Sequence, residues 1–152
     1  MKSVLITVAV GALLLEFGSC ELQQLTVKVL AQRRVESLNR LLLSLNVASY
    51  PKAVNIDIEI HVDQLFSSGG WFWTRRATIE ERKQRQEVLD AADAFVADWK
   101  HGNAQVVQTD KWRGVRDMWL TCSNPGIFGE EFTRVLILED DVELSPAWYV
   151  LP

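Results

Sequence analysis

Apolar and polar residues recur along the chain in two periods, which predict strands and helices in turn. Residues 56–63 read Ile-Asp-Ile-Glu-Ile-His-Val-Asp, and this strict alternation predicts a strand with one buried face and one wetter face. Residues 25–31 predict an earlier strand, and residues 104–108 predict a short later one. Apolar residues at helical spacing predict an amphipathic helix between the first two strands: Val35, Leu38, Leu41, Leu42 and Leu45.

Two further helices complete this alternation. An apolar stripe over residues 88–99 predicts a helix that opens on the charged run 80–87, which we expect to form a solvated face. Residues 115–122 predict a third, short helix. Strands that alternate with helices predict an α/β fold, here a Rossmann-like, mostly parallel sheet with flanking helices.

The last predicted strand runs directly into three acidic residues. Residues 135–138 are continuously apolar, which is typical of a central strand covered on both faces. Glu139, Asp140 and Asp141 follow at its carboxyl end. Adjacent carboxylates repel one another unless a cation or hydrogen-bond donors compensate them, and ligands of open α/β sheets bind outside the carboxyl ends of the strands. The sequence therefore predicts a site for a hard metal ion, Mn²⁺ or Mg²⁺.

The ends of the earlier strands add candidate partners to this site. Arg33 and Arg34 lie where the first strand hands over to a helix N-terminus, a natural position for an anion, although a pair of solvated arginines is an equal alternative. Asp63 ends the second strand and should lie at the same edge as Arg34. Together these residues predict a metal-dependent nucleotide or nucleotide-sugar site. The alternative is that the acidic strand ends cap neighbouring helices or bind nothing.

Other chemistry-bearing residues favour ordinary roles. His61 lies on the polar face of the second strand, where we expect a solvated side chain rather than a ligand or a base. The aromatic triplet at residues 71–73 either covers a ligand or folds back on the domain. No Cys/His cluster is present, so a zinc site is not expected.

Composition and charge exclude one class of partner. The chain has 152 residues, 48% of them hydrophobic and 24% charged, which corresponds to one globular domain or part of one. Its 16 basic and 20 acidic residues give a net charge of -4. No basic excess is available for phosphate contacts, so we expect no nucleic-acid partner.

The N-terminus predicts a targeting segment. Residues 4–15 form an apolar run after Lys2, too short for a typical spanning helix, and Gly18, Ser19 and Cys20 offer small residues for cleavage. We therefore predict a signal peptide or short signal-anchor over residues 1–20, a domain over residues 21–152, and a location in the secretory pathway, in the Golgi or ER lumen. A membrane would be contacted only through an uncleaved leader. Cys122 is then a single thiol, or pairs with Cys20 if the leader is retained.

The acidic strand end also carries a family resemblance. The pattern from Glu139 to Pro146 resembles the DXD-type signature of GT-A glycosyltransferases, in the Glu-Asp-Asp form of the N-acetylglucosaminyltransferase I type and related family-2-like enzymes. The first strand and its turn at residues 27–34, the strand end at Asp63 and the helix at residues 114–119 are also similar to that family. The resemblance covers residues 25–149 and implies the donor-binding half of a GT-A domain.

The resemblance implies a role for each site residue. Asp141 would coordinate Mn²⁺, while Glu139 and Asp140 would contact the ribose, the sugar or metal-bound water. Arg34 would lie beside the uracil or the diphosphate, and Asp63 would accept from the uracil ring. The implied reaction moves a sugar, with N-acetylglucosamine suggested, from a UDP-sugar to a hydroxyl of a glycan or glycoprotein acceptor.

The resemblance leaves catalysis unassigned. Enzymes of this family continue beyond the acidic strand, and that second half supplies the acceptor site and usually the base, so no catalytic base is predicted here. The alternative is a truncated, non-catalytic domain that binds nucleotide or metal. A nucleotidyltransferase is disfavoured because Gln32, Arg33 and Arg34 follow the first strand where a glycine-rich phosphate loop would be required.

Overall fold

The computed structural model describes residues 23–52, 54–66, 68–69, 74–123 and 134–149. These residues form six strands and three helices, in an order that alternates for most of the chain. The elements are β1 (Gln23–Ala31), α1 (Val35–Asn46), β2 (Val54–Val62), β3 (Ser68–Gly69), β4 (Thr74–Arg75), α2 (Ile79–Asp98), β5 (Ala104–Gln108), α3 (Gly114–Cys122) and β6 (Arg134–Glu139). The predicted leader and the aromatic triplet at 71–73 lie outside the described residues.

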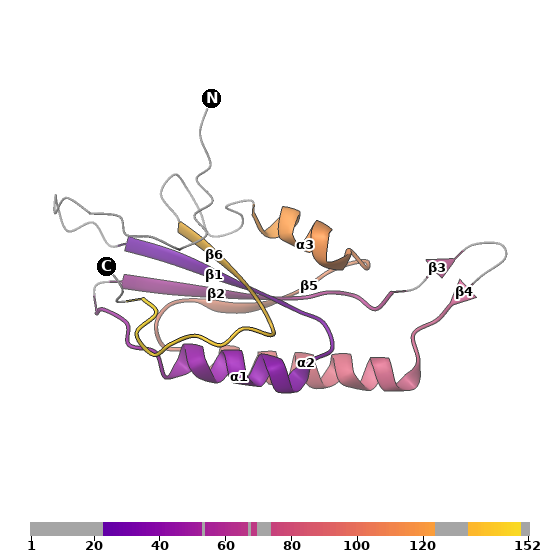
Figure 1. Ribbon diagram of the computed structural model, residues 1–152, viewed down its shortest axis with the longest axis horizontal. Helices are drawn as coiled ribbons and strands as arrows, with labels where there is room; N and C mark the ends of the chain where they lie inside the picture. Colours follow the sequence, from indigo (N-terminus) through magenta and orange to yellow (C-terminus); the bar gives the residue numbers. More distant parts are fainter. Residues whose placement is uncertain (1–22, 53, 67, 70–73, 124–133, 150–152) are drawn as a thin grey trace, which may run out of the picture.

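Four strands form a parallel sheet in the order β5-β2-β1-β6, and β3 pairs with β4 in a separate antiparallel ribbon. Helices α1 and α2 lie on one face of the sheet and α3 lies on the other (Figure 1). The predicted α/β, Rossmann-like arrangement is therefore confirmed. The chain moves from β1 through β2 to β5 and then returns past both to β6, so the winding direction reverses between β1 and β6.

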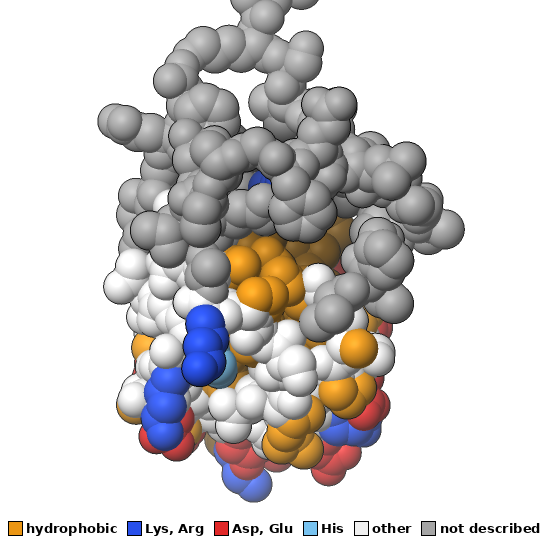
Figure 2. All heavy atoms as spheres, turned by 90° about the vertical axis from the view of Figure 1, so that its left-hand side faces the viewer, with side chains coloured by type: hydrophobic (Ala, Val, Ile, Leu, Met, Phe, Trp, Pro, Cys, Tyr) orange, Lys and Arg blue, Asp and Glu red, His pale blue; other side chains and the backbone are white. Residues whose placement is uncertain are grey.

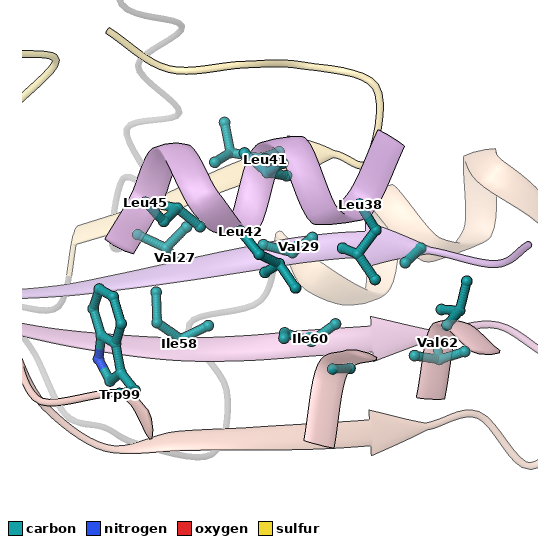
Figure 3. Close-up of a cluster of buried hydrophobic side chains, with 14 of the residues drawn as sticks. Val27, Val29, Leu38, Leu41, Leu42, Leu45, Ile58, Ile60, Val62 and Trp99 are labelled. Carbon is teal, nitrogen blue, oxygen red and sulfur yellow. The ribbon is translucent and has the colours of Figure 1, made fainter. Parts of the chain in front are cut away.

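The main core lies between the sheet and α1 with α2. Leucines of α1 point onto alternate residues of β1 and β2, including Val27, Val29, Ile58 and Ile60 (Figure 3). Each such side chain contributes about 1.5–3 kcal/mol when fully buried, which makes this face the principal source of stability. Trp99 closes one end of the core, and its indole N–H donates to the carbonyl of Ile56 over 2.8 Å. Figure 2 shows charged side chains along its lower edge, where Figure 1 places α1 and α2.

The other face of the sheet corrects two predictions. Strand β2 is buried on both faces, so its polar residues are not wetter: Glu59 and His61 are 1% and 7% exposed. His61 Nε2 lies 2.8 Å from Glu59 Oε2, and Lys28 Nζ of β1 lies 3.3 Å from the same oxygen. The prediction of a solvated His61 is wrong because its neighbours on the polar face form a buried, charge-paired layer.

Helix α3 packs on this second face at the β1 and β6 side of the sheet. Met118 and Cys122 contact Leu30 of β1 and Ile137 of β6. Cys122 is a free thiol rather than half of a disulfide, and burial raises its pKa to about 11. Of the apolar stripe predicted for residues 115–122, Met118 and Cys122 pack on the sheet, whereas Val115 and Trp119 are exposed.

Strand β6 is not the central strand that its apolar run predicted. Within the described sheet it pairs with β1 alone and forms an edge. Its apolar residues are nevertheless half-buried or buried, because the segment after β6 doubles back along α1 on one face (Figure 1) and Ile137 packs against α3 on the other. There Leu144 and Trp148 pack on the main core, and the Leu144 amide donates to Ser44 Oγ over 3.1 Å.

Helix α2 begins in a complete capping box. The Thr78 hydroxyl accepts from the Glu81 amide, and the Glu81 carboxylate accepts from the Thr78 amide. Half of the charged run at 80–87 is exposed, as predicted for a solvated face, and the other half is partly buried: Glu81 bonds Arg33, and Arg85 donates to the Asp63 carbonyl. Of the helices in the described ranges, none combines the length and apolar character needed to cross a membrane.

Candidate functional site

A pocket lies at the point where the winding direction reverses, outside the carboxyl ends of β1 and β6. In open α/β sheets this is where ligands bind, because the crossovers leave in opposite directions and open a crevice. The pocket has a volume of about 650 Å³, within the usual range for small-molecule sites. Its lining combines residues from three strand ends, α2 and α3: Leu30, Ala31, Gln32, Arg33, Arg34, Asp63, Leu65, Phe66, Glu81, Trp112, Gly114, Val115, Met118, Glu139 and Asp140.

Arg34 joins the ends of β1 and β6 across this crevice. It occupies the N-cap of α1 but makes no side-chain capping bond there. Its guanidinium instead forms an ion pair with Asp140, and its Nη1 donates to Asp141 Oδ2 over 3.0 Å. A planar guanidinium suits two carboxylates presented side by side. Neither this arginine nor Arg33, which is paired with Glu81 at 2.7 Å, is simply solvated.

Asp140 and Asp141 differ sharply in environment. The backbone amide of Asp140 continues the sheet by donating to the Leu30 carbonyl over 3.0 Å, and its side chain is 4% exposed. Burial raises the pKa of Asp140, although the nearby charge of Arg34 opposes that shift. Asp141 lies one residue further out, with its side chain 47% exposed. Arg34 therefore pairs with one buried carboxylate and with one that is accessible to solvent.

Glu139 is oriented by an aromatic residue of α3. Trp119 Nε1 donates to Glu139 Oε1 over 2.9 Å, and Glu139 also lines the pocket. The three adjacent carboxylates are thus compensated by donors from two elements, Arg34 from the start of α1 and Trp119 from α3.

Asp63 reaches the same pocket, as predicted, but its carboxylate is already bound to the protein. It accepts from the Thr109 hydroxyl at 2.9 Å and from the backbone amides of Gln64, Arg113 and Gly114 at 2.8, 3.1 and 2.8 Å. Gly114 is the first residue of α3, so the alternative that an acidic strand end caps a neighbouring helix is confirmed for Asp63. Its predicted bond to a uracil ring stays a prediction.

Three residues that line the pocket and one that lies beside Glu139 were not singled out from the sequence. Phe66 and Trp112 form an aromatic pair at the pocket, Trp119 orients Glu139, and Glu81 holds Arg33. They lie in polar stretches or on a helix, where neither the strand nor the helix periodicity of apolar residues distinguishes them from ordinary surface residues. The one usable signal is the Trp-Arg-Gly sequence at residues 112–114, an aromatic residue just before a glycine that opens a helix.

The donor set determines what kind of metal site is chemically possible. Among the described residues, no group of three or more His, Cys, Asp or Glu side chains could hold a metal ion. Mg²⁺ in proteins is usually bound by one or two carboxylates together with substrate phosphates and water. The exposed Asp141 fits such shared binding, in which a ligand supplies most of the oxygens. The residues do not fit a metal site made from protein groups alone.

Comparison with known proteins supports the fold. No protein-family model matches the chain, and no curated protein sequence matches it. Among solved structures, it is similar to S. aureus TarS 1-349, a glycosyltransferase, with a TM-score of 0.50 and 14% identity. The match covers 82% of this chain and 29% of that chain, so this chain spans less than a third of the TarS structure. The chain has a glycosyltransferase-like α/β fold.

Proposed function

We propose that the chain is the donor-binding region of a glycosyltransferase that takes a UDP-sugar, with N-acetylglucosamine as the suggested sugar. The observation that carries the proposal is the pair of ion pairs from Arg34 to Asp140 and Asp141, of which Arg34 and Asp140 line the pocket at the β1/β6 reversal. In this proposal the guanidinium of Arg34 pairs with phosphate oxygens, and the neighbouring Asp141 carboxylate binds a metal ion. The likeness of the fold to a glycosyltransferase supports the same assignment.

Each protein group has a separate part in this proposal. Arg34 donates to the diphosphate, and the buried Asp140 keeps the guanidinium at the pocket. Asp141 is the protein ligand of Mn²⁺ or Mg²⁺, which when bound would neutralise charge on a departing diphosphate. Glu139, fixed by Trp119, accepts hydrogen bonds from the ribose or sugar hydroxyls. The acceptor is a hydroxyl of a glycan or glycoprotein in the secretory pathway, the location predicted by residues 1–20.

Calorimetry of UDP with and without Mn²⁺ tests this assignment. We expect Mn²⁺ to strengthen UDP binding to the wild-type chain and Asp141→Ala to abolish that dependence. Asp90→Ala is a matched control, because Asp90 is an exposed acid on α2 that accepts a bond from Gln86. Equal UDP binding in all samples, or none in any, would refute the proposal.

A second candidate is a domain that binds the nucleotide without transferring sugar. It is favoured by one observation, that each carboxylate lining the pocket is engaged by the protein: Asp63, Glu81, Glu139 and Asp140. A general base must reach the proton that it removes, and these groups are held by other donors. An activity assay separates the two candidates. The chain is incubated with UDP-N-acetylglucosamine and sugar acceptors, and the release of UDP is measured by chromatography. Turnover above that of the Asp141→Ala variant would favour the enzyme.

A further inference from the structure

An aromatic pair forms one wall of the pocket. Phe66 follows β2 and Trp112 precedes α3, and their ring centroids lie 4.7 Å apart at an interplanar angle of 76°. Both side chains are partly exposed, Phe66 at 38% and Trp112 at 45%. Large aromatic rings exposed together at a cavity are typical of a surface that binds an apolar or flat group.

The loop that carries Trp112 is fixed by Asp63. The Asp63 carboxylate accepts from the Thr109 hydroxyl before Trp112 and from the amides of Arg113 and Gly114 after it. A carboxylate has about four lone-pair sites, so these bonds, with that from the Gln64 amide, use most of its capacity. Asp63 is also only 4% exposed. Its observed bonds are those of a residue that holds a loop.

Gly114 completes the support of the indole. Its φ of +70° is strained for residues with a side chain, and an added Cβ would lie 2.9 Å from Trp112 Cζ2. The ring therefore lies directly against the start of α3, in a place that only glycine leaves open. Trp112 is thus held from both sides of its loop, before any ligand binds.

The β1 end of the pocket is charged rather than aromatic, and its two arginines lie beside the carboxylates of Glu81, Glu139 and Asp140. Arg33 and Arg34 line it at the β1 end, while Phe66 and Trp112 line it beyond the β2 end. A nucleoside diphosphate that binds with a divalent cation suits both ends, because its phosphates can pair with the arginines, the cation with carboxylates and its flat ring with the aromatic pair.

Resting on the proposed function, we infer that the nucleobase stacks its face on the indole of Trp112, with Phe66 beside it in the same wall, and that Asp63 is a positioning residue for Trp112. Stacking does not read the edge of a base, so this wall accepts uracil and cytosine alike. Asp63 affects base binding through the 109–114 loop, and not by accepting a bond from the base.

Calorimetry with three ligands separates the base from the phosphates: UDP, uridine and pyrophosphate. We expect Trp112→Ala to weaken UDP and uridine by about tenfold or more, the usual effect of removing a stacking ring, and to leave pyrophosphate unchanged. Trp112→Phe should restore most of the affinity. Leu120→Ala is the control, because Leu120 is a 66% exposed side chain on α3 that does not line this pocket.

Asp63→Asn tests the positioning role. We expect it to weaken UDP and CDP equally, to spare pyrophosphate, and to add little when combined with Trp112→Ala. A changed UDP-to-CDP ratio, or a loss that adds to that of Trp112→Ala, would show a direct bond from the base and overturn the role of Asp63. Circular dichroism checks that each variant is folded.

Failure of the inference differs from failure of the proposed function. If the wild type binds UDP and Trp112→Ala binds it as Leu120→Ala does, the aromatic wall is wrong while the donor site stands. If pyrophosphate binds but UDP gains nothing over it, the base subsite is likewise wrong. If neither ligand binds the wild type, the proposed function is refuted and the base subsite with it.

Discussion

Replacing Arg34 by alanine should make the stability of the domain strongly pH-dependent. The substitution removes the guanidinium that pairs with Asp140 and Asp141, whose side chains are 4% and 47% exposed. Asp141 can be hydrated when Arg34 is lost. Asp140 cannot, so its charge is left buried beside a like charge.

The size of the effect follows from burial on the two sides of the ion pair. Removing one partner of a fully buried pair costs about 3–5 kcal/mol, whereas exposed pairs contribute about 0–1 kcal/mol. Arg34 is half-exposed, with its side chain 55% accessible, and its contribution must be reduced for solvent screening. We therefore expect Arg34→Ala to lower the free energy of unfolding by about 1–3 kcal/mol at pH 7.

The pH dependence has a definite sign. Burial already raises the pKa of Asp140, and Arg34 opposes that shift, so its removal raises the pKa further. A carboxyl whose folded pKa exceeds its unfolded value loses stability as pH rises from the unfolded pKa toward the folded one. The deficit of Arg34→Ala should therefore be full at pH 7 and shrink as the pH falls toward 4, near the unfolded pKa of about 3.9.

Urea unfolding followed by circular dichroism between pH 4 and pH 7 measures this deficit. Arg33→Ala is the matched control, because Arg33 is the neighbouring arginine and its acidic partner Glu81 is less buried than Asp140, with side chains 15% and 4% exposed. We expect the control to change by less than about 1 kcal/mol and to show a weaker pH dependence. If Arg34→Ala matches Arg33→Ala at every pH, Arg34 does not compensate the acidic strand end.

Three further substitutions or treatments test other parts of the structure. Burial alone would raise the pKa of Glu59, but the hydrogen bond with His61 helps to lower it below its usual value. The ionised Glu59 therefore stabilises the fold above pH 4.5, and this stabilisation is lost as the pH falls through the lower folded pKa. In urea unfolding, Glu59→Gln should weaken this loss of stability at acid pH and cost about 1–3 kcal/mol at pH 7. Gly102→Ala would place a Cβ 2.3 Å from the Ile56 carbonyl oxygen, and we expect a loss of about 1–3 kcal/mol, so an unchanged melting temperature would contradict the packing. Cys122, with a pKa of about 11, should react with iodoacetamide at pH 8 at least about a hundredfold slower in the folded chain than in urea, and equal rates would show that the thiol is not buried.

The fold was predictable where local pattern and final environment agree. Leu25, Val27 and Val29 alternate with polar residues in β1, and the leucines of α1 recur at 3.6-residue spacing, so both elements follow from sequence alone. The wet face predicted for β2 was wrong for a physical reason. Alternation reveals two different faces, but what covers each face depends on distant parts of the chain. Glu59 and His61 are buried because they pair with each other and with β1. The alternation of apolar and polar residues does not reveal that pairing.

The sequence predicted at which edge of the sheet the site lies, but not which of its residues contact one another. Parallel strands end at one side of a sheet, so Arg34, Asp63 and the acidic triplet had to lie near one another. The ion pair between Arg34 and Asp140 joins residues 106 positions apart, and no spacing rule selects it over a bond between Arg33 and Asp141. Trp112 was not selected from the sequence, because Asp63 and Gly114 fix the position of its loop only in the folded chain.

The acidic triplet itself is better understood as a charge balance than as a ready metal site. Adjacent carboxylates need compensation, and here the protein supplies it from Arg34 and Trp119. A lone cation would have to compete with Arg34 for Asp141, while a lone diphosphate would have to draw Arg34 from both acids. A diphosphate and a divalent cation that bind together avoid both costs. The diphosphate pairs with Arg34, and the cation pairs with the Asp141 carboxylate that Arg34 has released. The metal dependence that we expect for UDP binding is therefore a consequence of Arg34 as much as of Asp141.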